Sequence, residues 1–195
     1  SKSEILVGSL GNIRPAKAYD VLIKAAAIAV KEKPEFHFVI AGDTKKEPLM
    51  SELKELTKKE DVTANVHFIG FQDNSADFLG QMDIFLLSSS SEGFSISTIE
   101  AIATGLPVIA TKCGGPEEII VNNIDGYLVE ANNPEKINKT LCEHLSNKEA
   151  AKVITCAGTL KAKQKFSEQI MLKEYTKIYA TTPQNTSSKT KLINE

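Results

Sequence analysis

Short apolar runs that alternate with helical segments are the feature that most constrains the fold of this chain. Ile84–Leu87 is apolar at every position, and Phe36–Ala41 and Pro107–Ala110 are nearly so. A strand without a polar face is buried on both sides, which is typical of a parallel sheet covered by helices. Tyr19–Val30 shows the spacing of a helix that joins two such strands. Because crossovers between parallel strands are right-handed, the pattern predicts a doubly wound, Rossmann-like α/β fold.

The rest of the chain continues this alternation. The other expected strands are Ile5–Val7, Val66–Ile69 and Gly126–Val129, and the other expected helices are Leu49–Lys58, Ala76–Leu79, Ser97–Gly105, Pro116–Val121 and a helical C-terminal third that begins with Ile137–Leu145. Residues 181–195 are rich in Thr, Ser, Asn, Gln and Lys, with almost no apolar side chain. We therefore expect one domain over residues 1–180 and a polar, disordered tail over residues 181–195.

The charge balance and the cysteines exclude several classes of protein. The 195 residues include 23 basic and 25 acidic ones, for a formal net charge of -2. Duplex nucleic-acid binders usually carry a dense basic face, so we expect no nucleic-acid partner. No apolar stretch approaches the roughly 20 residues that cross a bilayer. The 3 cysteines are far apart and show no disulfide or zinc pattern, which predicts a cytoplasmic protein without a bound metal.

Three loops follow predicted strands at the edge where open parallel sheets bind ligands. The first loop runs from Gly8 to Lys17 and places Arg14 and Lys17 at the entrance of a helix. Cations at this position oppose the helix dipole, at a cost of about a few tenths of a kcal/mol each. A bound phosphate would remove the conflict, while solvated surface charges are the alternative. The loop lacks the dinucleotide and P-loop glycine patterns, which disfavours both of those nucleotide sites.

The second loop carries the strongest chemical signal. The serines Ser88–Ser91 follow a buried strand, and Glu92 and Gly93 then precede a helix. Gly93 allows the backbone to approach a ligand closely, and the amides of residues 94–97 are expected to face an anion. The third loop, Cys113–Glu118, has two glycines before Pro116. It is either a tight connection from strand to helix or another point of ligand approach.

Glu100 follows Glu92 by eight residues, and two roles remain open for it. On one continuous helix the two carboxylates would lie about 12 Å apart along the axis. That separation exceeds the roughly 5–9.5 Å of glycosidase carboxylate pairs. With Glu92 in the loop and Glu100 in the helix, they would instead hold two ends of one extended ligand. Alternatively, Ser97 to Glu100 forms a capping box, and Glu100 satisfies only the start of its own helix.

Taken in order, these residues resemble the retaining group 1 (family four) glycosyltransferases. The resemblance is to the C-terminal, nucleotide-sugar-binding domain of a GT-B enzyme, so the chain would be one half of a GT-B fold. It extends from Ile5 to at least Leu145 and includes the Glu-x7-Glu signature of Glu92 and Glu100. The segments that carry it are Asn12–Lys17, Phe38–Asp43, Val66–Gly70, Ser88–Glu100, Ala101–Gly105, Pro107–Ala110, Gly114–Ile119 and Asp125–Val129.

The resemblance implies three residues for the chemical step. Lys17 and Arg14 would contact the donor diphosphate and stabilise it as a leaving group. Glu92 would hold hydroxyl groups of the donor sugar. Arg14 would supply the charge of an arginine that the family commonly has directly after the first-loop glycine. Ala18 stands where the family usually has glycine, and this alanine should be tolerated if its φ is negative.

The resemblance also implies residues for donor binding. Gly93, Phe94 and Ser95 would offer backbone amides near the sugar and phosphate groups. Glu100 would accept hydrogen bonds from the ribose hydroxyls. His67 would lie where the nucleotide base packs.

The implied activity is transfer of a hexosyl-type sugar from a nucleoside diphosphate sugar to a glycan or lipid acceptor, as in polysaccharide biosynthesis. No metal or other cofactor is expected. An acceptor-binding domain would precede Ser1 in the parent chain, so this part alone would bind the donor without turning it over. Through that missing half the enzyme would associate with the inner face of the membrane. The alternatives are a non-catalytic nucleotide-binding module and a GT-B-fold nucleotide-sugar epimerase.

Overall fold

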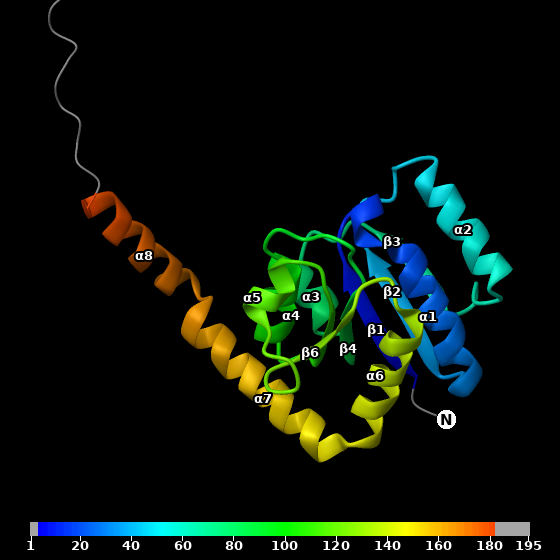
Figure 1. The fold of residues 1–195 in the computed structure, drawn as a ribbon. Helices are drawn as coiled ribbons and strands as arrows, with labels where there is room; N and C mark the ends of the chain where they lie inside the picture. The colour runs from blue at the N-terminus through cyan, green and yellow to red at the C-terminus, as the bar shows by residue number, and fades with distance from the viewer. Residues whose placement is uncertain (1–3, 182–195) are drawn as a thin grey trace, which may run out of the picture.

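The chain forms a six-stranded sheet with a layer of helices on each face (Figure 1). A computed structural model describes residues 4–181. The strand order is β3-β2-β1-β4-β5-β6, and every neighbouring pair is parallel. The strands are β1 Ile5–Leu10, β2 Phe36–Ala41, β3 Val66–Gly70, β4 Ile84–Leu87, β5 Val108–Lys112 and β6 Tyr127–Glu130. The predicted doubly wound, Rossmann-like α/β fold is therefore confirmed.

The helices lie where the sequence places them. They are α1 Tyr19–Glu32, α2 Leu49–Lys59, α3 Ser75–Leu79, α4 Ile96–Ala103, α5 Gly115–Ile119, α6 Pro134–Ser146, α7 Lys148–Lys165 and α8 Glu168–Thr181. A 3-10 helix, Pro15–Lys17, is an addition that the sequence pattern did not indicate. It shapes the loop between β1 and α1 and so bears on the site described below.

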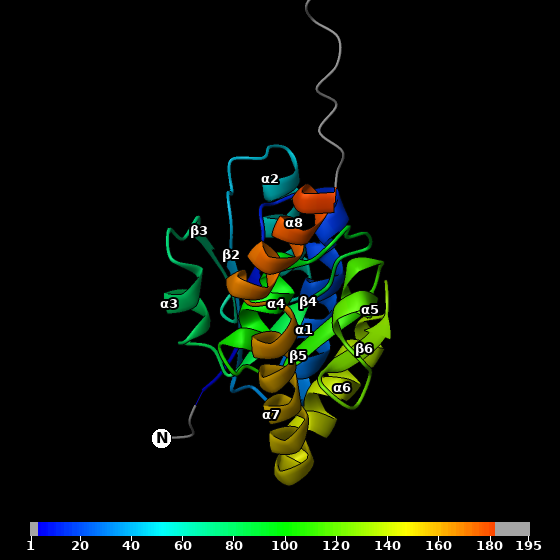
Figure 2. The ribbon, with the colours of Figure 1, turned by 90° about the vertical axis from the view of Figure 1, so that its left-hand side faces the viewer.

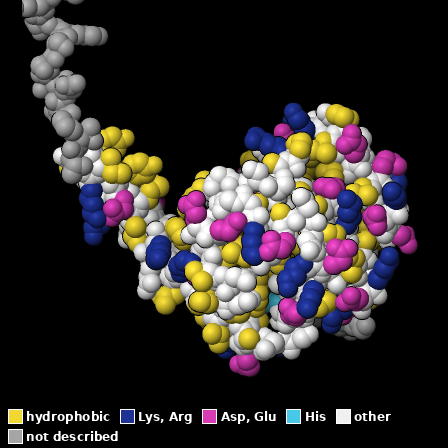
Figure 3. Space-filling model, in the orientation of Figure 1, with side chains coloured by type: hydrophobic (Ala, Val, Ile, Leu, Met, Phe, Trp, Pro, Cys, Tyr) yellow, Lys and Arg dark blue, Asp and Glu magenta, His cyan; other side chains and the backbone are white. Residues whose placement is uncertain are grey.

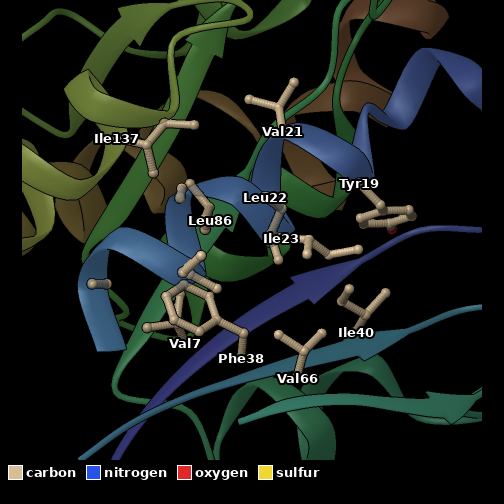
Figure 4. Close-up of a cluster of buried hydrophobic side chains, with 14 of the residues drawn as sticks. Val7, Tyr19, Val21, Leu22, Ile23, Phe38, Ile40, Val66, Leu86 and Ile137 are labelled. Atoms are coloured by element: carbon tan, nitrogen blue, oxygen red, sulfur yellow. The ribbon is translucent and has the colours of Figure 1, made fainter. Parts of the chain in front are cut away.

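The alternation of side chains along the strands fills two cores. In β4, Ile84 and Leu86 point to the core beneath α1, α2 and α6, whereas Phe85 and Leu87 point to the core beneath α3, α4, α5 and α7. Figure 4 shows the first core, where Leu22 of α1 and Ile137 of α6 lie over side chains of the sheet. Burial on both faces is the reason that β4 has no polar residue.

The strand order reverses direction between β1 and β4. Val7 of β1 pairs with Ile84 of β4, so these two strands lie side by side although β2 and β3 come between them in the sequence. Loops after β1 and β4 consequently diverge to opposite faces of the sheet. This divergence opens the crevice in which doubly wound domains bind ligands.

The helix α7 is fixed to the domain, and α8 continues away from it (Figures 1 and 2). A Cβ on Gly158 of α7 would lie 2.5 Å from the carbonyl oxygen of Asp125, so this close packing requires glycine. Lys161 of α7 donates to the Asp125 carboxylate at 2.7 Å. The predicted polar tail begins at Thr181, the last residue of α8, and the remainder of it lies outside the described residues.

The surface carries charges of both signs. Figure 3 shows one face of the molecule, where Lys and Arg side chains are interspersed with Asp and Glu side chains. Apolar side chains are visible along α8 in the same view. In the described part of the chain, no helix is long and apolar enough to cross a membrane.

Candidate functional site

A pocket of about 470 Å³ lies at the carboxyl edge of the sheet, beside the point where the strand order reverses. Its walls come from the loops after β1, β2, β3 and β4 and from α3 and α4. The lining residues are Leu10, Gly11, Asn12, Arg14, Lys17, Ala41, Gly42, Phe71, Gln72, Ser75, Glu92, Phe94, Ile96, Ser97 and Glu100. Five of the predicted site residues are therefore brought together here, namely Arg14, Lys17, Glu92, Phe94 and Glu100.

The first loop packs closely against the end of β2. The N–H of Gly11 donates to the carbonyl oxygen of Ala41 at 2.8 Å, and the N–H of Asp43 donates to Oδ1 of Asn12 at 3.0 Å. A Cβ on Gly42 would lie only 2.0 Å from the carbonyl oxygen of Gly11. Glycine at position 42 thus allows the loops after β1 and β2 to come this close, and their contact holds Asn12 at the pocket.

Lys17 and Glu92 form an ion pair in the wall of the pocket. Nζ of Lys17 lies 2.7 Å from Oε1 of Glu92, and their side chains are 18% and 16% exposed. Oγ of Ser89 donates to the same carboxylate oxygen, also at 2.7 Å. Lys17 is therefore a partly buried, paired cation rather than a solvated surface charge. Its conflict with the helix dipole is relieved by a carboxylate even without a ligand.

Arg14 is placed differently from Lys17. It is the residue before the 3-10 helix Pro15–Lys17, and its side chain is exposed while it lines the pocket. The described residues offer its guanidinium no ion-pair partner. Five N–H donors in a planar group are thus available to an anion at this edge of the pocket.

Glu100 does not cap its own helix. The helix α4 begins at Ile96, with Ser95 as the N-cap residue, so the Ser97–Glu100 pattern lies inside the helix. Instead, Oε1 of Glu100 accepts a hydrogen bond from Oγ of Ser75 on α3 at 3.1 Å. The capping-box prediction is wrong, and the carboxylate faces the pocket with one hydroxyl partner.

The start of α4 presents unpaired amides. Within the described residues, the N–H groups from Phe94 to Ser97 have no protein acceptor. Phe94 lines the pocket, whereas Gly93 and Ser95 flank it. Oγ of Ser95 is buried and accepts a hydrogen bond from Oγ1 of Thr98 at 2.9 Å. Free amides at a helix N-terminus are a favourable environment for an anion.

His67 lies away from this pocket. It lies near the amino end of its strand, whereas the pocket lies at the carboxyl edge of the sheet. There, its Nε2 is 3.1 Å from Nδ1 of His37, and the two rings stack. Glu4 approaches the other side of His37, at 4.0 Å. Burial, followed by the neighbouring His37, lowers the pKa of His67. The prediction that His67 packs against a base is not supported, because its strand points the ring toward His37 rather than toward the pocket.

The glycines of the third loop are explained by close packing against the second loop. A Cβ on Gly114, whose φ is +110°, would lie 2.5 Å from the carbonyl oxygen of Glu92. A Cβ on Gly115 would lie 2.5 Å from the carbonyl oxygen of Gly93. Oε2 of Glu117 accepts from the N–H groups of residues 113 and 114. Of the two roles left open for this loop, the tight connection is the one observed.

Ala18 has an unusual backbone conformation for a residue with a side chain. Its φ and ψ are both 46°, in the left-handed region, at the N-cap position of α1. The condition of a negative φ, under which alanine would be tolerated without strain, is therefore not met. The left-handed conformation costs an L residue about 1–2 kcal/mol, which glycine avoids. The bend at Ala18 redirects the chain from the 3-10 helix into α1.

Several pocket residues were missed by the sequence reasoning. Phe71 and Gln72 follow the last residue of β3, and Ser75 begins α3. The side chain of Phe71 is 68% exposed although it is aromatic. Ile96, at the start of α4, is also an exposed apolar residue of the pocket. For Phe71 and Gln72, the position directly after a strand was the available signal, since the loops of parallel strands share one edge.

The site has neither a metal-binding cluster nor an activated thiol in the part of the chain that is described. No group of three His, Cys, Asp or Glu side chains there is arranged to hold a metal ion. Cys113 lies close enough to sense the charges of Glu92 and Lys17, but burial raises the pKa of its thiol. The charged groups that line the pocket are two cations, Arg14 and Lys17, and two carboxylates, Glu92 and Glu100. This set suits a polar ligand that contains both anionic and hydroxyl groups.

Known proteins resemble the chain in sequence. The sequence profile of the family described as glycosyl transferases group 1 matches residues 1–161. An uncharacterized glycosyltransferase from Haemophilus influenzae is 31% identical over 142 residues, which are 72% of this chain and 39% of that protein. The chain spans less than half the length of the curated relatives it matches.

Solved structures agree with the fold. The C-terminal domain of a group 1 family protein, LpcC, from Francisella tularensis has a TM-score of 0.77 at 30% identity, over 86% of this chain and 88% of that one. Alr3699/HepE from Anabaena, solved in complex with UDP, has a TM-score of 0.87 at 20% identity, over 92% of this chain and 50% of that one. Together with its Rossmann-like fold, typical of one half of a GT-B enzyme, the matched sequence shows that the chain belongs to the group 1 glycosyltransferases.

Proposed function

We propose that this chain is the donor-binding part of a retaining glycosyltransferase that uses a nucleoside diphosphate sugar. The observation that carries the proposal is the meeting of Arg14, Lys17, Glu92 and Glu100 in one pocket at the carboxyl edge of the sheet. A nucleoside diphosphate sugar has a charged centre between two hydroxyl-rich ends. The pocket brings together groups that match both parts, namely two cations for the phosphates and two carboxylates that accept hydrogen bonds from hydroxyl groups.

The diphosphate would lie between the first loop and the start of α4. The Arg14 guanidinium and the Lys17 ammonium would contact phosphate oxygens from one side. The unpaired amides from Phe94 to Ser97 would contact them from the other side. Negative charge grows on the diphosphate as its bond to the sugar breaks, so groups held in place for that charge lower the barrier.

The nucleoside would lie toward α3 and the end of β3. The Glu100 carboxylate, already bonded to the Ser75 hydroxyl, has acceptor capacity left for ribose hydroxyls. Phe71 presents an exposed aromatic ring next to Gln72 at the same end. A planar base would cover this ring and bury apolar surface.

The sugar would lie beside Glu92. This carboxylate holds Lys17 and Ser89 through one oxygen, and its contact with Lys17 makes the two sites adjacent. A donor would bring sugar hydroxyls to Glu92 and phosphate oxygens to Lys17, so each partner of the ion pair would gain a new contact. We propose that the hexosyl-type sugar is transferred with retention and without a bound metal.

The remaining parts of the enzyme would come from outside this chain. Because the matched segment covers less than half of each of these curated relatives, we propose that a second domain supplies the acceptor site. The acceptor would be a glycan or a lipid, and that second domain would bring the enzyme to a membrane surface. The 195-residue chain would bind the donor and transfer nothing by itself.

Calorimetry on the chain with UDP, GDP and ADP and with the corresponding sugar nucleotides tests this proposal. Binding of one of the nucleoside diphosphates, reduced by Glu100→Ala, is the expected result. Matched variants in which a surface glutamate such as Glu149 is replaced by alanine should bind as the unmodified chain does. Failure of every nucleoside diphosphate to bind at millimolar concentration would refute a donor site.

A further inference from the structure

The backbone of the first loop is held by hydroxyl groups from both of its sides. Oη of Tyr19, at the start of α1, donates to the carbonyl oxygen of Gly11 at 2.7 Å. Oγ of Ser88, directly after β4, donates to the carbonyl oxygen of Lys17 at 2.9 Å. These two carbonyl groups stand at the beginning and the end of the segment that carries the cations of the pocket.

Both hydroxyl donors are buried and lie outside the pocket. The side chains of Tyr19 and Ser88 are 2% and 1% exposed, and neither residue lines the pocket. Burial raises the pKa of Tyr19 well above its ordinary value, so the phenol keeps its proton as a donor at every physiological pH. A ligand in the pocket would meet Arg14 and Lys17 but would not touch these hydroxyls.

The segment between the two carbonyls needs such fixing. Residues 11–17 contain one short 3-10 turn and otherwise irregular backbone, which by itself has many alternative conformations. The segment ends in Ala18, whose left-handed conformation is unfavourable for a residue with a side chain. A second bond from the serine run supports this end, because the N–H of Ser90 donates to the carbonyl oxygen of Ala16 at 2.8 Å.

We infer that Tyr19 and Ser88 are positioning residues for the phosphate end of the pocket, an inference that rests on the proposed function. Tyr19 fixes the segment at Gly11, and Ser88 fixes it at Lys17. Together they set where the Arg14 and Lys17 side chains emerge. Ser88 also ties the segment to the loop of Glu92, so that Lys17 meets the Glu92 carboxylate at 2.7 Å.

Loss of a positioning hydroxyl should weaken recognition of the phosphates more than recognition of the nucleoside, which lies toward α3. UDP and UMP differ by one phosphate group and share the nucleoside. The ratio of their dissociation constants therefore reports on the phosphate end, whereas loss of folded protein or a general loosening would change both constants alike.

The test compares Tyr19→Phe and Ser88→Ala with controls that lose a hydroxyl elsewhere. Tyr127→Phe is matched to the first, since its phenol lies 3.3 Å from Nδ1 of His144, between β6 and α6. Thr57→Val is matched to the second, since this buried hydroxyl donates to the carbonyl oxygen of Lys54 at 2.8 Å. Calorimetry with UDP and with UMP is run well below the melting temperature of each variant.

We expect UDP affinity to fall about three- to tenfold in each positioning variant, the size of one lost hydrogen bond, with less than a twofold change for UMP. The controls should change neither affinity. Equal weakening of UDP and UMP, or unchanged UDP affinity, would overturn the inference while leaving the proposed function intact. Failure of the unmodified chain to bind UDP, GDP or ADP would overturn the proposed function, and with it this inference.

Discussion

Removing the charge of Glu92 from its ion pair with Lys17 should have two opposite effects, one on stability and one on ligand affinity. Oε1 of Glu92 accepts from both Lys17 and Ser89, and in Glu92→Gln an amide would keep the shape while removing the charge. The folded protein should lose stability, because a partly buried ammonium would then lack its counter-charge. The affinity for UDP should rise, because Glu92 would no longer compete with the diphosphate for Lys17.

The size of the stability effect follows from the burial of the pair. Both side chains are less than one fifth exposed, so solvent screens this pair less than a surface ion pair. A hydrogen bond to a charged group contributes about 1.5–3 kcal/mol to stability. Since glutamine keeps an acceptor oxygen, we expect Glu92→Gln to lower the free energy of unfolding by about 1–2 kcal/mol. Lys17→Met should lower the free energy of unfolding less in the Glu92→Gln variant than in the unmodified chain, with a coupling energy of about 1 kcal/mol in the double-mutant cycle.

The binding effect is measured by calorimetry with UDP and with a set of UDP-hexoses. A gain of about 1.4 kcal/mol in binding free energy corresponds to a tenfold gain in affinity. Because Glu92→Gln frees Lys17 from its carboxylate partner, UDP should bind several-fold more tightly to this variant. The UDP-hexose that binds best to the unmodified chain should gain less or lose affinity, because its hydroxyls lose a charged acceptor.

Glu130→Gln is the matched control for this prediction. Glu130 pairs with Lys112 at the surface, on two neighbouring strands away from the pocket, and both side chains are exposed by more than a third. A surface pair contributes about 0–1 kcal/mol, so the control should be nearly neutral in stability and unchanged in binding. Equal changes in the affinities for UDP and the UDP-hexose in Glu92→Gln, or unchanged stability, would refute this account of the pair.

Four further results are expected. Ala18→Gly should raise the free energy of unfolding by about 0.5–1 kcal/mol, because glycine adopts the left-handed conformation without strain; a loss of stability in urea denaturation would contradict this. Phe71→Ala should weaken the binding of UDP and of UMP by the same factor, since in the proposed site it would remove only contact with the base, and a selective loss of UDP affinity would argue against this. Glu100→Ala should abolish the preference for UDP over 2′-deoxy-UDP, a preference of about 1–3 kcal/mol if a buried hydrogen bond is at stake. Burial lowers the pKa of His67 and of His144, so the unfolded chain binds their protons more readily than the folded chain does. The free energy of unfolding should therefore fall as the pH decreases below about 6.5. His67→Gln should make this fall with pH less steep, and an unchanged pH dependence would show that His67 does not contribute.

The fold was predictable because burial leaves a direct trace in the sequence. The strand β4 is apolar at each of its positions since Ile84 and Phe85 face different cores. Glycine and proline mark the ends of neighbouring segments, as at Gly70 and Pro107. These signals are local, and they identified the strands, the helices and the edge at which loops gather.

The contacts of the site were less predictable because they depend on residues far apart in the chain. The Ser97–Glu100 spacing matches a capping box, but α4 begins at Ile96, and the true partner of Glu100 is Ser75, 25 residues earlier. His67 and His37 share a face because His67 pairs with Val39, two residues beyond His37. A period-two pattern gives the faces of a strand, whereas the register between strands decides which side chains meet.

The Lys17–Glu92 pair also bears on how product would leave the proposed site. In the proposed site, the donor would offer phosphate oxygens to Lys17 and sugar hydroxyls to Glu92, so both charges would keep partners after their ion pair separates. The nucleoside diphosphate that remains after transfer would offer partners only to Lys17. Glu92 must then either stay without a hydroxyl donor from the ligand or draw Lys17 back. Since an unpaired, largely buried carboxylate is unfavourable, the pair should favour donor over product and assist the release of the diphosphate.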